Sequence, residues 1–453
     1  MSDPHALLFA LDERPPPGKS LTAAVAHLLA IVGGIATAPL IIARGLNLDV
    51  GQTTYLVAAA FTVSGIATFV QVYRFGHLGS GLLSVQGTSF AFVGVFIYAG
   101  LQLQADHTNA EVVGILLGTS AAGGIFTMAA SFVLQRLSTI ITLNVAGIVI
   151  FLLGLSLVQV AFANLNAAAS QAAGMQSMMV WVQAGVVVAC IAFLSSRNNP
   201  WVKLSSICAG LMLGVAFAFA TGGLDRSLPE LTRGVALLQL APFPLGFDPI
   251  VFLLLLPIFL VTITESIGDL TATSLLSGCS VQGNSYWQRI RGGVMADGFN
   301  TTLAAMFGTF PNTTFSQNNG VIRLTGVASR YVGMILAGLL VLLGSVPLVS
   351  AVFQVLPGGV LHGATGLMFA MIMFAGLRIL RAQPDLRRTM TMLVICTAGA
   401  LALTQSGRVS GAAGVDLPDY VLILTNFPVA TGAVLAMLWE LLAPARAQPA
   451  ELS

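Results

Sequence analysis

The sequence predicts an all-α polytopic membrane protein with fourteen transmembrane segments, arranged as two inverted repeats of seven segments. Three observations support this prediction: the composition, the apolar stretches, and the distribution of arginine and lysine. Of the 453 residues, 56% are hydrophobic and only 8% are charged. A soluble domain carries about 25% charged residues, so lipid is expected to be the main solvent of this chain. Nucleic acid is not expected as a partner, because no basic patch lies away from the membrane edges.

Twelve long apolar stretches each approach the roughly 20 residues that a helix needs to cross a bilayer. They lie at residues 21–43, 54–72, 111–134, 138–158, 178–196, 203–222, 248–268, 292–310, 331–349, 352–377, 390–404 and 420–442. Two shorter apolar pieces, 84–99 and 311–329, are interrupted by polar residues, glycine or proline. Counting both pieces as crossings gives fourteen spans, seven in each half.

The two interrupted pieces share a pattern. Each contains a threonine-containing run that ends in phenylalanine, at Phe90 and Phe315, and then a helical stretch. Because β-branched residues favour extended backbone, spans 3 and 10 are predicted to be part strand and part half-helix. Interrupted segments at matching positions of two halves indicate a transporter binding site. The structural alternative is a pair of re-entrant loops that bind no ligand.

The positive charges are distributed unevenly between the predicted loops. With the N-terminus in the cytoplasm, most of the 19 lysines and arginines fall on the cytoplasmic side, as the positive-inside rule requires. Seven spans per half is an odd number, so the halves are predicted to be inverted and both termini to be cytoplasmic. The predicted parts are a cytoplasmic N-terminal tail at 1–20, a first repeat at 21–235, a second repeat at 236–444 and a cytoplasmic C-terminal tail at 445–453.

Three carboxylates and one histidine lie within apolar surroundings. Glu265 and Asp269 are four residues apart and therefore share one helix face, while Asp297 follows in a glycine-rich stretch. An ionised carboxylate at the bilayer centre costs about 2.5–3.5 kcal/mol on insertion scales, so such a group usually faces a cavity, pairs or carries a proton. The alternative of a helix-end residue that reaches water fits Asp297 best. His27 in the first span either carries a proton or is a hydrogen-bonded core residue.

The densest polar cluster at membrane depth covers residues 312–320 and ends where a helix is expected to begin. A helix start directs N–H groups and a partial positive charge into its surroundings, which suits an electron-rich ligand. Gln317 offers a donor and an acceptor from one amide, Glu265 would accept from a ring N–H, and Phe90 would pack against a ring. These features favour a flat polar heterocycle as the ligand.

The run from Gln317 to Gly333 closely resembles the signature of the nucleobase–ascorbate transporter family of nucleobase–cation symporters. The segments 265–269 and 296–298 are similar to that family's eighth and ninth spans, and the chain as a whole is most similar to its bacterial xanthine permeases. The resemblance implies a core domain of spans 1–4 and 8–11 and a gate domain of spans 5–7 and 12–14. It also implies proton-coupled import of a purine base by alternating access.

The resemblance implies two groups of functional residues by matching position. The substrate-binding group is Glu265, Gln317, Phe90, Ser89 and Asn318. The group that supports the site and its proton coupling is His27, Asp269 and Asp297. The proton is the only coupling ion expected, with no other cofactor and no metal. A bacterial inner-membrane location is expected, and a homodimer is an expectation from the family alone.

Two positions bear on the substrate. Purine-dione carriers of the family have glutamine at the position of Gln317, whereas uracil carriers have glutamate, which favours xanthine or uric acid here. Ser89 stands where close xanthine permeases carry the larger asparagine, so uric acid is expected to fit as well. A permease for uracil or another nucleobase is the alternative within the family. A channel or anion transporter of similar fold and an intramembrane aspartyl protease are more remote alternatives, and no enzyme activity is expected.

One departure from the family has no assigned consequence. Arg323 occupies a variable position of the signature that is usually uncharged, and it reaches the cytoplasmic interface or alters gating.

Overall fold

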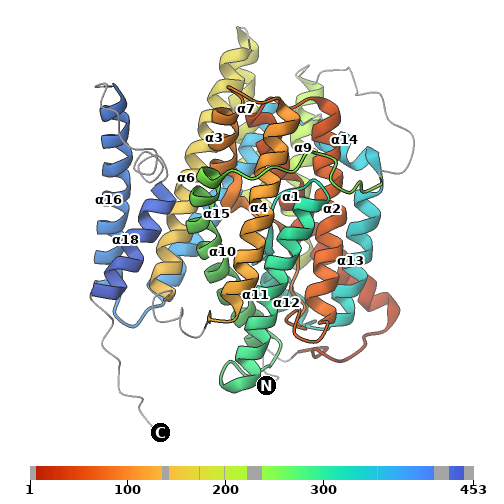
Figure 1. Cartoon of the computed structure of the whole chain (residues 1–453). Helices are drawn as coiled ribbons and strands as arrows, with labels where there is room; N and C mark the ends of the chain where they lie inside the picture. Colours follow the sequence, from red (N-terminus) through yellow and green to blue (C-terminus); the bar gives the residue numbers. More distant parts are fainter. Residues whose placement is uncertain are drawn as a thin grey trace. The chain divides into compact units, whose positions relative to one another are not determined.

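The computed structural model describes residues 7–134, 142–172, 174–197, 199–221, 237–354, 356–412 and 428–442. Helices make up most of these ranges (Figure 1). Within them, eight helices are long and apolar enough to cross a membrane, or nine if one bent pair is counted as a single span. The chain is therefore a multi-pass membrane protein, and the number of fourteen spans stays a prediction.

Every predicted apolar stretch of the first half contains a helix in the part that the structure describes. The elements are α1 (Pro17–Gly45), α2 (Val50–Tyr73), β1 (Gln86–Thr88), the 3-10 helix η1 (Phe90–Phe92), α3 (Val93–Leu103), α4 (Asn109–Ser131), α6 (Leu143–Gln171), α7 (Met175–Ser195), α8 (Pro200–Leu204) and α9 (Ser206–Ala220). The helix predicted at 138–158 continues to Gln171, because the alanine-rich residues that follow favour helix although they are less apolar. The loop expected to join the repeats, at 223–235, lies outside the described residues.

The second half follows the same pattern. Its elements are α10 (Pro249–Leu276), α11 (Gly283–Met306), β2 (Asn312–Thr314), α12 (Gln317–Thr325), α13 (Arg330–Gly344), α14 (Pro347–Gln354), α15 (Gly358–Arg381), α16 (Leu386–Ala412) and α18 (Pro428–Leu442). The prediction of one helix over 331–349 is wrong, because α13 and α14 meet at an angle of 78°. Pro347 lacks an N–H group and starts a new helix rather than continuing the old one.

Side-chain caps explain where several helices begin. Asp49 accepts a hydrogen bond from the backbone N–H of Gln52 at 2.8 Å, and the Gln52 side chain returns the interaction, which forms a capping box before α2. Thr108 and Glu111 form the same arrangement before α4. Asp248 caps α10 through the N–H of Val251 at 2.8 Å.

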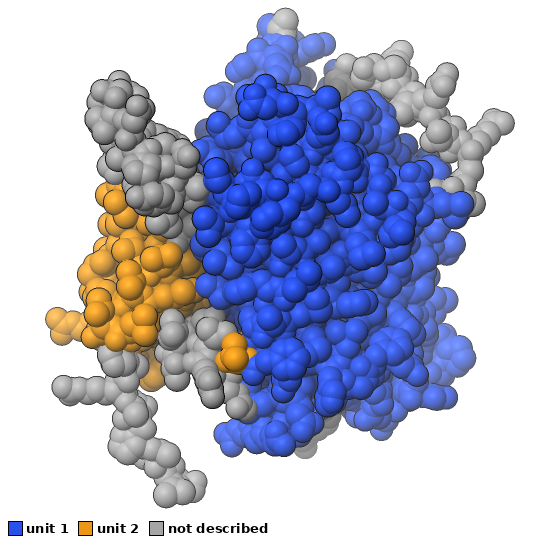
Figure 2. All heavy atoms as spheres, viewed as in Figure 1, with its two compact units in different colours: residues 1–132, 157–368 blue, residues 133–156, 369–453 orange. Residues whose placement is uncertain are grey.

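Contacts divide the chain into two compact units (Figure 2). The larger unit comprises residues 1–132 and 157–368, and the smaller comprises 133–156 and 369–453. The larger unit contains every element expected for the core domain, together with α7, α8, α9, α14, the C-terminal part of α6 and the N-terminal part of α15. The boundary between a core and a gate domain therefore stays a prediction.

Pairs of helices in the larger unit repeat between the two halves. Span 4 (α4) packs on span 9 (α11), and span 2 (α2) packs on span 11 (α13). If the two repeats correspond, span 4 matches span 11 and span 2 matches span 9, so the two contacts are equivalent. Both pairs need small residues at the contact. A Cβ on Gly298 would lie 2.5 Å from the carbonyl oxygen of Gly124, and one on Gly65 would lie 2.6 Å from that of Ala337. Direct backbone contact of this kind is typical of helices that associate in lipid.

The two short strands pair with each other although they lie in different halves of the chain. β1 and β2 are antiparallel, with Gly87 opposite Thr313 in the centre of the register. Two further backbone bonds extend the pair, from Ser89 N–H to the Pro311 carbonyl at 2.8 Å and from Phe315 N–H to the Val85 carbonyl at 2.9 Å. The prediction that spans 3 and 10 combine a strand with a half-helix is confirmed, and the pairing satisfies backbone groups that lipid could not.

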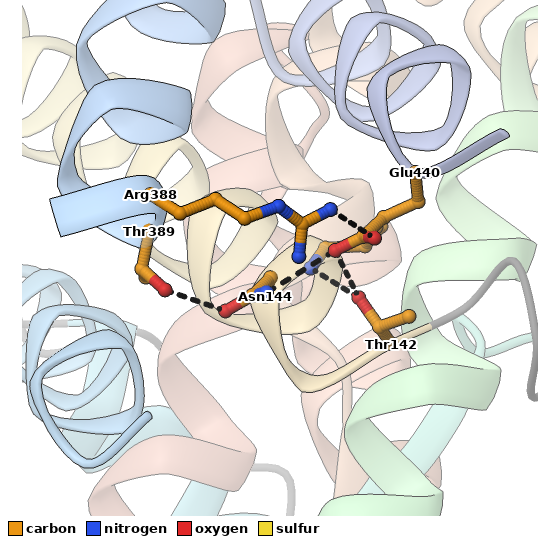
Figure 3. Close-up of polar contacts among 6 residues, drawn as sticks. Thr142, Asn144, Arg388, Thr389 and Glu440 are labelled. Atoms are coloured by element: carbon orange, nitrogen blue, oxygen red, sulfur yellow. Dashed lines mark hydrogen bonds and ion pairs between the residues drawn. The ribbon is translucent and has the colours of Figure 1, made fainter. Parts of the chain in front are cut away.

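A buried polar cluster joins α6, α16 and α18 in the smaller unit (Figure 3). The carboxylate of Glu440 lies 2.8 Å from the guanidinium of Arg388, and their side chains are 1% and 18% exposed. Thr142 Oγ1 and Asn144 Nδ2 donate to the other carboxylate oxygen at 3.0 and 3.1 Å. Thr389 Oγ1 in turn donates to Asn144 Oδ1 at 3.1 Å. The ion pair is thus embedded in hydrogen bonds from three helices and the residue before α6.

Candidate functional site

Two half-helices begin where the paired strands end. Ser89 follows β1 directly and caps η1, its Oγ accepting a hydrogen bond from the N–H of Ala91 at 3.3 Å. α12 begins at Gln317, three residues after β2 ends at Thr314. Because the strands are antiparallel, the half-helices leave the pair at opposite ends, and the positive end of each helix dipole points back toward it.

One face of α10 meets these junctions, since α10 packs on β2, η1, α3 and α12. The Oδ2 atom of Asp269 accepts a hydrogen bond from Thr314 Oγ1 at 3.1 Å, and its backbone carbonyl accepts one from Asn319 Nδ2 at 3.4 Å. Glu265 lies one turn earlier on the same helix and is only partly buried. Its carboxylate makes no hydrogen bond to any residue that the structure describes.

Gln317, like Glu265, has a side chain that can hydrogen-bond a ligand. Its side chain is partly exposed at the first position of α12, and its amide has no hydrogen-bond partner within the described ranges. Ser89 and Phe90, at the other junction, are 2% and 6% exposed. The structure therefore brings the elements that carry Glu265, Gln317, Ser89 and Phe90 into contact around the strand pair. The roles of the four residues in binding stay predictions.

Asp297 lies in the interior of the larger unit and not at a helix end. It is 5% exposed and sits well within α11, so the alternative of a residue that reaches water is wrong. Ser266 Oγ donates a hydrogen bond to Asp297 Oδ2, and Ser266 also lies 3.3 Å from Thr313 Oγ1 of β2. Gln86 of β1 lies beside the same carboxylate. Asp297 is thereby connected to both strands and to α10.

His27 is fully buried in α1 and lies next to Asn318. Asn318 Nδ2 donates a hydrogen bond to the carbonyl of Leu83, just before β1. Neither ring nitrogen of His27, nor Oδ1 of Asn318, has a hydrogen bond of normal geometry among the described residues. Buried polar atoms without partners are uncommon, so ordered water is expected beside this pair.

The sequence does not single out the neutral residues that connect the predicted carboxylates. They are Gln86, Ser266, Thr313, Thr314 and Asn319. Ser266 stands directly after Glu265 in the sequence, and that adjacency was the available signal for it. Gln86, Thr313 and Thr314 belong to the two interrupted pieces, but their partners depend on the register of the strands.

Comparison with known proteins gives a consistent family. A family model described as a permease family matches residues 18–407. The xanthine permease XanQ of Escherichia coli is 37% identical over 448 residues, which cover 97% of this chain and 94% of XanQ. The xanthine permease XanP of the same species is 36% identical over 98% of this chain and 96% of its own length. A uric acid-xanthine permease of Emericella nidulans is 30% identical over 87% of this chain and 75% of its own length.

Solved structures of similar fold are more distant in sequence. The transmembrane domain of the cyanobacterial bicarbonate transporter BicA superposes with a TM-score of 0.58 at 15% identity, covering 94% of this chain and 98% of that domain. The murine anion transporter Slc26a9, in its inward-facing state, gives a TM-score of 0.59 at 13% identity, covering 95% of this chain and 69% of that protein. At these identities the likeness concerns the fold alone, and it confirms the predicted fold class.

Proposed function

The chain belongs to the nucleobase–ascorbate transporter family of permeases, and we propose that it imports a purine base, either xanthine or uric acid or both, together with a proton. One observation carries this proposal. The side chains of Glu265 and Gln317 make no hydrogen bond to the described residues, and they lie on elements that meet at the strand–helix junctions of spans 3 and 10. Relatives that cover nearly the whole chain are named xanthine permeases, which supports transport rather than catalysis.

The chemistry of the site suits a purine-dione. The carboxylate of Glu265 accepts a hydrogen bond from a ring N–H, and the amide of Gln317 both donates to a ring carbonyl and accepts from its neighbouring N–H. The ring of Phe90 packs against the purine face. Hydrogen bonds to a charged group are stronger than those between neutral groups, so Glu265 contributes most of the directional binding.

Proton coupling is assigned to the buried carboxylates. Glu265 both binds the base and carries the proton. Asp269, Asp297 and His27 support the site through the contacts described above. Ionising a carboxylate at membrane depth costs free energy, so a proton is expected to enter together with the substrate. With a neutral base such as xanthine, the proton moves one charge inward, which gains about 2.3 kcal/mol per 100 mV of membrane potential.

The transport cycle is proposed to run by alternating access in the bacterial inner membrane, with both termini in the cytoplasm. The excess of positive charge in the loops on the side of the termini supports this orientation. A homodimer is proposed from the family alone.

Uptake of radiolabelled xanthine in cells without purine permeases tests the function. Uptake is expected to be sensitive to an uncoupler and to be blocked by excess uric acid but not by uracil. Adenine and hypoxanthine serve as further competitors. Absence of xanthine and uric acid uptake by protein that has reached the membrane would refute the proposal, and labelled uracil would then test the alternative within the family.

Replacing Ser89 with asparagine is expected to lower the ratio of uric acid to xanthine uptake by about tenfold, because the larger side chain removes room for an additional oxo group on the imidazole ring. The fold is expected to tolerate the change, since asparagine caps a helix as well as serine does. Competition of uric acid against labelled xanthine measures the ratio.

Ser89→Ala is the matched control for that experiment. It removes the capping oxygen without adding volume, so it should retain uric acid transport even if the abundance of the protein falls. An unchanged ratio in Ser89→Asn would show that position 89 does not determine which purine-dione is accepted.

A further inference from the structure

A cavity of about 800 Å³ lies at the C-terminal end of α1, within the larger unit. Residues of α6, α7 and α15 form its other walls together with the ends of the neighbouring loops. The lining is rich in amide side chains, among them Asn164, Gln171 and Gln176. Amides present both donors and acceptors, so this wall can hydrogen-bond either edge of a polar ligand.

The described lining residues of the cavity carry a positive charge. Arg44, in the last turn of α1, lines it and donates a hydrogen bond to the carbonyl of Leu356 at 3.0 Å. None of the described lining residues is an aspartate or a glutamate. A guanidinium carries five N–H donors in a planar fork, so one guanidinium can hydrogen-bond several acceptors at the same time.

Two buried polar side chains also line the cavity. Gln183 is 3% exposed and His362 is 8% exposed. The Nδ1 atom of His362 has no hydrogen-bond partner in the described part of the chain. Native structures leave few such buried atoms unsatisfied, so His362 indicates that a ligand or ordered water occupies the cavity.

The cavity is separate from the candidate site. Ile35 of α1 lies against the strand pair at Gly87, and Arg44 follows nine residues later on the same helix. At 1.5 Å per residue, the Cα atom of Arg44 lies roughly 14 Å farther along the helix axis than that of Ile35. With the N-terminus in the cytoplasm, this is the outer end of α1.

We propose that this cavity is an outer vestibule that binds uric acid as its monoanion before the base reaches the strand–helix junctions. Arg44 contacts an exocyclic oxygen that shares the negative charge of the anion, and the amides and His362 contact the remaining polar edge. The volume exceeds that of a single purine, so the bound base keeps part of its hydration. The inference rests on the proposed function for the identity of the ligand, and the anion chemistry follows from the cavity.

Transport kinetics test the vestibule. Uric acid is predominantly a monoanion at pH 6, whereas xanthine is predominantly neutral. Arg44→Gln is expected to raise the KM for uric acid about tenfold, to change the KM for xanthine at pH 6 much less, and to leave the maximal rate unchanged. Arg44→Lys keeps the charge and should recover most of the uric acid KM. Arg197→Gln removes an equal charge from an exposed site at the end of α7 and is the matched control.

Direct binding separates the vestibule from the candidate site. Full-length protein carrying Glu265→Gln, in lipid nanodiscs, is expected to keep weak binding of labelled uric acid that Arg44→Gln removes. Displacement of the label by chloride or inorganic phosphate at equal concentration would overturn the assignment of the cavity to the uric acid anion. If the Glu265→Gln protein shows no residual binding of uric acid, or if that binding does not depend on Arg44, the vestibule proposal is overturned.

The two experiments distinguish a failure of the vestibule proposal from a failure of the proposed function. Normal uptake with KM values that do not respond to Arg44→Gln would refute the vestibule and leave the proposed function intact. Arg44-dependent binding of uric acid without any purine uptake would support the vestibule and refute the proposed transport.

Discussion

Replacing Glu265 with glutamine is expected to abolish purine uptake while the protein still reaches the membrane at normal abundance. Glutamine keeps the size of the side chain but cannot accept at both oxygens or carry the proton. Glu265 makes no hydrogen bond to the described residues, so its replacement leaves no internal group unpaired. Loss of a hydrogen bond to a charged group costs about 1.5–3 kcal/mol, which is roughly 10- to 150-fold in binding. Initial uptake rates and immunoblots of membranes measure the two effects.

A matched control uses another glutamate. Glu111→Gln alters the capping box before α4, where glutamine serves as well as glutamate, and it should transport normally. Gln317→Ala should lose uptake as Glu265→Gln does. Near-normal transport by either site variant would mean that the substrate is recognised elsewhere.

Replacing Glu440 with alanine is expected to destabilise the protein by about 3 kcal/mol. The change leaves the guanidinium of Arg388 largely buried without its carboxylate, and the donors on Thr142 and Asn144 lose their acceptor. The fraction of protein that remains monodisperse after heating in detergent, compared with wild type, measures the loss. Asp106→Ala removes an exposed carboxylate and should stay within about 0.5 kcal/mol of wild type.

The double variant Arg388→Met, Glu440→Met provides the decisive comparison. Removing both charges together replaces a buried ion pair with apolar volume, which is often nearly neutral, so the double variant should be more stable than Glu440→Ala. A double variant as unstable as the single one would show that the helices depend on side-chain shape at these positions and not on the ion pair.

Much of the fold could be predicted from the sequence because apolar length determines where a helix crosses lipid. α2 and α10 begin within a few residues of the predicted stretches. The predicted ends are less accurate where a helix continues past its apolar part, as in α11, which begins at Gly283 instead of residue 292. Hydropathy reports the solvent of a segment, whereas the helix ends where its hydrogen bonds end.

Composition alone pointed to the charged members of the candidate site, whereas its uncharged members were predicted from the polar cluster at 312–320, the interrupted pieces and the family resemblance. A carboxylate in an apolar run is conspicuous, so Glu265, Asp269 and Asp297 could be identified without a structure. Neutral partners such as Gln86 are common in transmembrane segments, and their contacts follow from a strand register that no local pattern determines. The ion pair between Arg388 and Glu440 also could not be predicted, because the two residues lie in different helices and no local pattern shows that these helices meet.

The pairing of β1 with β2 also sets an order in time for making this protein. β2 is synthesised roughly 225 residues after β1, and at about 5–20 residues per second that interval is roughly 10 to 45 seconds. Throughout it, the backbone groups of β1 lack the partner that later satisfies them. The first half must therefore wait in the membrane with its third segment incomplete, shielded by water, lipid headgroups or the insertion machinery. The ligand site cannot exist until the tenth segment arrives to close it.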